Sequence, residues 1–211
     1  MYANTRPVIF LGGGGDIEAS AELDAIFFAG LRHAAKILYI PTAMDSEMYH
    51  DATKWFTKLI GMYSDTIDCV TMTENNVNEI KFDDFDAVYI GGGNTYKLLD
   101  FVVSNKLGGK LRTFIKSGKV FYGGSAGAIL TGKTINTASE MDPKLDYKYD
   151  KGLNWLNGAS VSCHWPETKH CTVELLRTSP QKIYCIPENC GILFDVDGNL
   201  LRIVGSGVEI L

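Results

Sequence analysis

The sequence predicts an α/β fold, in which a single doubly wound, mostly parallel sheet carries helices on both faces. Two observations lead to this prediction. Short apolar runs rich in β-branched residues alternate along the chain with longer stretches whose apolar residues recur at helical spacing. The short runs are also apolar at nearly every position, which a strand covered on both sides of a parallel sheet requires.

The first five strands and four helices are expected where these patterns are strongest. Residues 8–11 form the first apolar run, and Pro41 stops the second. The fourth run ends in a glycine-rich turn at residues 91–95. The predicted strands are residues 8–11, 37–40, 67–72, 86–90 and 119–122, and the predicted helices are residues 23–34, 48–60, 98–103 and 107–115.

The last third of the chain has a different pattern. Strand-like runs follow one another at residues 160–163, 182–186, 191–196 and 200–204 with little helix between them. Some antiparallel or edge strands are therefore expected there, and Asp197-Gly198-Asn199 predicts a hairpin turn. Because the chain shows neither an internal repeat nor a linker, residues 1–211 are expected to form a single catalytic α/β domain.

The composition of the chain indicates which partners and which cellular location to expect. The chain has 211 residues, a formal net charge of −5 and a pI of about 5.4, so a nucleic-acid partner is not expected. No apolar run approaches the length of a membrane span, so no membrane partner is expected either. The five cysteines form no CxxC pair and no export signal precedes them, which favours reduced thiols and a cytoplasmic location.

A serine lies at the centre of the most informative motif. Gly123-Gly124-Ser125-Ala126-Gly127 follows a predicted strand and precedes small apolar residues typical of a helix start. This G-x-S-x-G pattern places a serine hydroxyl at the tip of a tight turn, with the next backbone N–H directed at a developing oxyanion. The glycines on either side are expected because a Cβ there would clash with the neighbouring strand or helix.

A serine nucleophile needs a base, and the base needs a group that orients it. Of the four histidines, His164 follows a predicted strand directly and is therefore expected at the sheet edge where α/β proteins place their sites. Three carboxylates on loops could orient its imidazole. Glu188 follows another strand end, and Glu140 and Asp142 lie on a separate loop, so position alone leaves all three open.

The motifs together resemble peptidase family S51, which contains dipeptidase E and cyanophycinase. The resemblance covers nearly the whole chain, and its most specific features are residues 91–95 (GGGNT) and 124–128 (GSAGA) in this order and spacing. It implies a fold related to the class I glutamine amidotransferases and a triad of Ser125, His164 and Glu188. It also implies an oxyanion hole made by the backbone of Gly92 and Ala126, with Gly93 as a further donor.

The resemblance also implies a substrate class. It points to hydrolysis of dipeptides or short peptides, without a metal or an organic cofactor, and leaves a homodimer open. Candidate substrate-binding residues are Asn94, Thr95, Glu140 and Lys169. The family's aspartyl dipeptidases carry an arginine in the stretch after the histidine. Residues 165–170 contain none here, so an Asp-X preference is in doubt.

The sequence offers three other interpretations. Residues 127–134 match the phosphate-loop pattern G-x-x-x-x-G-K-[ST], but no amphipathic helix follows, so a nucleotide binder is a remote alternative. The cysteines and histidines at 163–164 and 170–171 do not have a usual zinc spacing, and no metal site is expected. A member of the fold that only binds, or that hydrolyses another acyl substrate, is the third alternative.

Overall fold

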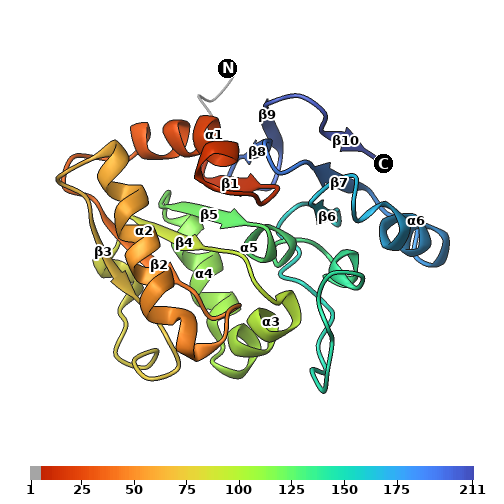
Figure 1. The fold of residues 1–211 in the computed structure, drawn as a ribbon, viewed down its shortest axis with the longest axis horizontal. Coiled ribbons are helices and arrows are strands. Elements are labelled where there is room, and N and C mark those ends of the chain that lie inside the picture. The colour runs from red at the N-terminus through yellow and green to blue at the C-terminus, as the bar shows by residue number, and fades with distance from the viewer. Residues whose placement is uncertain (1–5) are drawn as a thin grey trace.

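A seven-stranded sheet forms the centre of the computed structural model, which describes residues 6–211 (Figure 1). Its strand order is β3-β2-β4-β5-β1-β8-β9, and the pairs from β3 to β1 are all parallel. Strands β8 and β9 extend the sheet in antiparallel fashion. The strands are β1 (Ile9–Gly12), β2 (Lys36–Ile40), β3 (Asp68–Thr71), β4 (Ala87–Ile90), β5 (Val120–Gly124), β8 (Gly191–Phe194) and β9 (Leu200–Val204).

Helices cover both faces of this sheet. One face packs on α1 and α2, through an aromatic layer that includes Phe27, Phe56 and Tyr89. The other face packs on α3, α4 and α5. The helices are α1 (Ile17–Ala29), α2 (Tyr49–Tyr63), α3 (Thr95–Ser104), α4 (Leu107–Lys116), α5 (Ala126–Ile129) and α6 (Lys169–Thr178), with 3-10 turns η1 (Ser46–Met48), η2 (Phe82–Asp84) and η3 (Asn136–Ala138).

The predicted fold class is confirmed, and a small second sheet is added to it. Strands β6 (Ser160–Cys163) and β7 (Ile183–Ile186) pair in parallel, and β10 (Glu209–Ile210) joins β7 in antiparallel fashion. This sheet and α6 lie at the end of the molecule opposite β3 (Figure 1). The predicted hairpin after β8 is present: the N–H of Asp195 donates to the carbonyl of Asn199, and Gly198 has a φ of +81°.

The first helix differs from its predicted limits. It begins earlier, because the side chain of Asp16 accepts a hydrogen bond from the N–H of Ala19 and caps the N-terminus. It ends at Ala29 rather than near residue 34, because Gly30 closes the last turn and Ala34 has a φ of +53°. Within residues 6–211, no helix is both long and apolar enough to cross a membrane.

The carboxyl ends of the central strands converge at one edge. Gly12 at the end of β1 pairs with Gly124 at the end of β5, and Ile90 at the end of β4 pairs with Gly123. The loops that leave these strands therefore meet. Residues that follow β6 and β7 reach the same edge from the second sheet, and the candidate site lies there.

Candidate active site

Ser125 occupies a sharp turn between β5 and α5. Its φ of +49° and ψ of −111° lie outside the regions that ordinary residues favour, and its N–H donates to the carbonyl of Gly12 at 3.0 Å. A Cβ on Gly123 would lie 2.8 Å from the backbone nitrogen of Ala128, and one on Gly127 would collide with the carbonyl of Ile90. The steric reason predicted for both glycines is therefore confirmed.

His164 lies directly after β6 and faces the serine. Its Nε2 is 2.8 Å from the Oγ of Ser125, and its Nδ1 is 2.8 Å from Oε1 of Glu188. The residue also has a positive φ, +54°, and its N–H donates to the carbonyl of Gly13 at 3.0 Å. Backbone strain at both Ser125 and His164 is a feature that recurs at functional sites.

Of the three carboxylates left open by the sequence, only Glu188 contacts the imidazole. Asp142 accepts a hydrogen bond from the N–H of Thr95 at 2.8 Å. Glu140 pairs with His170 at 2.7 Å and accepts from the N–H of Cys171 at 3.0 Å, near the start of α6. The hydrogen bond from the Cys171 N–H holds the pKa of Glu140 below its ordinary value.

The glycine run after β1 packs against the histidine and the glutamate. A Cβ on Gly14 would lie 2.8 Å from Nε2 of His164, and one on Gly15 would lie 3.1 Å from the Cβ of Glu188. Gly14 and Gly15 also have φ values of +114° and +87°. This close backbone approach explains why glycines are needed here, and the sequence motif alone did not reveal it.

The predicted oxyanion donors lie on two sides of Ser125. A Cβ on Gly92 would be 3.6 Å from the Oγ of Ser125, so the turn after β4 runs alongside the hydroxyl. Gly93 has a φ of +130° and packs on the backbone of Ala43. Ala126 is the buried residue next to the serine in the chain. Within residues 6–211, the backbone N–H groups of Gly92 and Ala126 donate to no protein acceptor.

The four candidate substrate-binding residues have other contacts. The side chain of Asn94 caps α3 and donates to the carbonyl of Pro143 at 2.8 Å, so it fastens the loop after η3. Thr95 donates its N–H to Asp142 in the same loop. The ammonium of Lys169 lies over the ring of Trp165, 5.9 Å from its centre. Like Glu140, all three lie outside the cavity lining.

A cavity of about 650 Å³ opens at Ser125. Gly92, His164 and Glu188 line it at that end, and it extends between α1 and α2, where Leu23 and Trp55 form its walls. Its volume lies within the range typical of small-molecule sites. The part of this cavity between α1 and α2 could not be predicted from the sequence, because its lining residues follow the same periodicity as ordinary core positions.

The rival motifs find no support in the geometry. Backbone N–H groups from Leu130 to Lys133 all donate to carbonyls, so the stretch at 127–134 leaves no ring of free donors for a phosphate. Among residues 6–211, no group of three or more histidine, cysteine or acidic side chains could hold a metal ion. Burial raises the pKa of the Cys163 thiol well above its ordinary value, as expected for a structural cysteine.

Comparison with known proteins places the chain in a family. The model of "Peptidase family S51" matches residues 8–202. The chain belongs to peptidase family S51. Membership assigns the protein to the peptidases, a class of hydrolases. The sequence-based identification is thereby confirmed.

Sequence relatives agree with this assignment, and a solved structure shares the fold. "Peptidase E" of Nostoc sp. is 25% identical over 179 residues, which span 81% of this chain and 73% of that protein. "Peptidase E" of Pasteurella multocida is 27% identical over 57% of this chain, but the match spans only 55% of that relative. A putative Peptidase E protein from Listeria monocytogenes superposes with a TM-score of 0.69 at 22% identity, over 97% of this chain and 98% of that one. At this identity the likeness shows the fold alone.

Proposed function

We propose that the protein is a serine peptidase that hydrolyses dipeptides or short peptides through an acyl-enzyme. The observation that carries the proposal is the continuous chain Ser125–His164–Glu188, with both contacts at 2.8 Å. A hydroxyl, an imidazole and a carboxylate within hydrogen-bond distance of one another form the arrangement that activates a serine. We further propose that the whole chain acts as one catalytic domain.

The first step is attack of Ser125 Oγ on the substrate carbonyl. His164 Nε2 takes the hydroxyl proton as the C–O bond forms, and then gives that proton to the amine that leaves. Water next attacks the acyl-enzyme with His164 again as the base, and the acid and the free serine are released. Glu188 holds the imidazole by its Nδ1–H and stabilises the positive charge that forms on the ring.

In this proposal the backbone N–H groups of Gly92 and Ala126 donate hydrogen bonds to the developing oxyanion, with Gly93 as a further donor. Both Gly92 and Ala126 are without a protein acceptor in the part of the chain that the structure describes. A single donor of this kind typically contributes about 3 kcal/mol to stabilisation of the transition state.

A fluorophosphonate label tests the nucleophile independently of the substrate. We expect stoichiometric labelling of Ser125, located by peptide mass spectrometry, and its loss in His164→Ala. The proposal would be contradicted if the label were found on residues other than Ser125, or if His164→Ala were labelled at the same rate as the native protein. Ser20, which also lines the cavity but contacts Asp24 rather than a histidine, serves as an internal control serine.

A further inference from the structure

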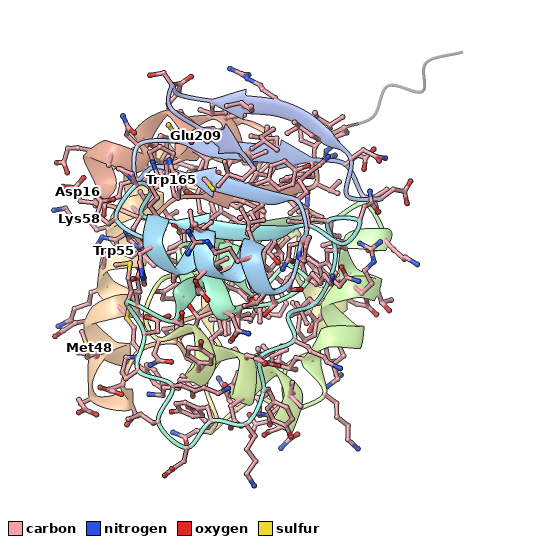
Figure 2. All side chains as sticks on the ribbon, turned by 90° about the vertical axis from the view of Figure 1, so that its right-hand side faces the viewer. Asp16, Met48, Trp55, Lys58, Trp165 and Glu209 are labelled. Carbon is pink, nitrogen blue, oxygen red and sulfur yellow. The ribbon has the colours of Figure 1, made fainter. Side chains whose placement is uncertain are left out.

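The far end of the cavity is an apolar chamber between two helices. Besides Leu23 of α1 and Trp55 of α2, its walls include Ala52 of α2 and the side chains of Met44 and Met48. Figure 2 shows Met48 and Trp55 along the same side of the molecule, with Asp16 above them. The chamber and Ser125 belong to one cavity. When the carbonyl of a substrate residue lies at the serine, the side chain of that residue can therefore extend between the helices.

The floor of the chamber is a ladder of tyrosines. Tyr39 of β2 is paired with Tyr89 of β4, and Tyr89 with Tyr122 of β5, so three rings lie side by side on the α1–α2 face. The Tyr89 and Tyr122 rings stack at 4.3 Å, and Tyr39 stacks on Phe56 at 4.4 Å. This floor is rigid and aromatic, and it suits a large uncharged group.

One polar atom in this floor has no protein partner. The hydroxyl of Tyr39 is buried and bonds to no group among the described residues. A Cβ on Gly91 would lie 3.6 Å from it, so the hydroxyl lies next to the turn that carries Gly92. Burial raises the pKa of Tyr39, which keeps the hydroxyl neutral. The neutral hydroxyl therefore contributes a dipole to the chamber and no charge.

The charged residues that line the cavity, apart from the catalytic histidine, are acidic. Its acidic lining residues are Asp16, Asp51, Asp142 and Glu188, whereas neither lysine nor arginine is among the lining residues that the structure describes. Lys58, one turn beyond Trp55 on α2, is exposed and outside the lining (Figure 2). A carboxylate that is removed from water needs a cation or several hydrogen-bond donors. In this cavity a substrate carboxylate would instead lie beside acidic side chains and apolar walls.

From these observations we infer that the chamber between α1 and α2 binds the side chain of the residue that acylates Ser125, and that it selects large uncharged side chains over acidic ones. The inference rests on the proposed function and makes it more specific. Leucine, methionine and phenylalanine have the size and polarity that the walls require. Aspartate in the same position loses its hydration without gaining a cation, so its transition state is disfavoured.

Aminoacyl p-nitroanilides test this selectivity directly. Asn and Asp derivatives differ in charge at nearly equal size, and Leu, Met and Phe derivatives add apolar bulk. We expect kcat/KM for the apolar substrates to exceed that for Asp by at least ~100-fold, with Asn between them. Equal or faster turnover of the Asp substrate would overturn the inference.

Two variants connect the selectivity to the chamber. Trp55→Ala should lower kcat/KM for the Leu and Phe substrates by ~10-fold or more while the Ala derivative is less affected, because only large side chains contact the indole. Met48→Arg, at a half-exposed position of the lining, should raise the ratio of Asp to Leu turnover by providing a cation. Lys58→Ala is the control. It should leave unchanged both the preference for large side chains over Ala and the ratio of Asp to Leu turnover. Ratios that stay the same in both chamber variants would contradict the assignment.

Labelling of Ser125 separates failure of this inference from failure of the proposed function. A labelled serine combined with no turnover of any apolar substrate would overturn the inference and leave the nucleophile in place. If Ser125 is not labelled and the protein turns over no substrate, the proposed function is overturned, and the inference with it.

Discussion

The backbone of Gly14 lies against the imidazole of His164, so closely that a Cβ at this glycine would come within 2.8 Å of Nε2. The same nitrogen is 2.8 Å from the Oγ of Ser125. The turn after the first strand thus packs against a ring carried by the residue that directly follows β6 of the second sheet. This relationship joins two segments that are 150 residues apart in the chain.

Gly14→Ala should displace the imidazole and reduce kcat by about 10²-fold, because small misplacements of reacting groups have costs of this size. Gly118→Ala is the matched control. Gly118 also has a positive φ, +83°, but a Cβ there would meet nothing within 4 Å. Both variants should lose about 1–2 kcal/mol of stability from strain, measured by denaturant unfolding, but only Gly14→Ala should lose turnover. Equal kcat values in the two variants would show that the glycine does not position the ring.

Glu188→Gln should reduce kcat by ~10²–10⁴-fold, because the amide no longer holds the charged imidazole. Steady-state hydrolysis of a dipeptide measures the effect. Glu140→Gln should leave kcat close to that of the native enzyme, since Glu140 contacts His170 and the Cys171 N–H instead. The opposite result, with a normal rate in Glu188→Gln and a large loss in Glu140→Gln, would reassign the orienting acid.

Much of this arrangement could be predicted from the sequence. Four of the five parallel strands are recognisable as short apolar runs, and β3 (Asp-Cys-Val-Thr) is the more polar edge strand. The residues after these strands are expected at one sheet edge. Ser125 and His164 followed from this placement. Glu188 could not be separated from Glu140 and Asp142 by position, because all three lie on loops; the contacts of their carboxylates distinguish them.

The remaining features depend on contacts between segments distant in sequence. Strand β10 has only two residues, Glu209–Ile210, too few to show a period. The second sheet was not predicted, because an apolar run does not specify which strands it pairs with. The tyrosines of the chamber floor, such as Tyr39 and Tyr122, have the pattern of core residues. The register of their strands places them side by side, and the three-dimensional structure shows that they line a cavity.

Asp24 provides a prediction about stability and pH. Its side chain is buried, with one oxygen accepting from Ser20 and the other unpartnered among the described residues. Burial raises its pKa above the ordinary value of 3.8, so the folded protein binds a proton more tightly than the unfolded chain does. Its contribution to the free energy of unfolding therefore falls as the pH rises from 3.8 through the raised pKa.

Asp24→Asn should remove this pH dependence and be more stable than the native protein at neutral pH. The difference between the two should grow by at most about 1.4 kcal/mol for each pH unit within the window. Urea unfolding between pH 4 and pH 8 measures it, with the exposed Asp65→Asn as control. Parallel pH profiles for Asp24→Asn and the native protein would contradict the prediction.

The proposed role of Ser125 as the nucleophile of a peptidase is best tested by hydrolysis of a dipeptide panel, in which the native protein is compared with Ser125→Ala. The panel should contain Leu-X, Lys-X, Asp-X and β-Asp-X peptides, followed by release of free amino acids, with circular dichroism to verify the fold of the variant. We expect turnover by the native protein and a loss of ~10⁴-fold or more in kcat for Ser125→Ala. Equal hydrolysis by both proteins would contradict it.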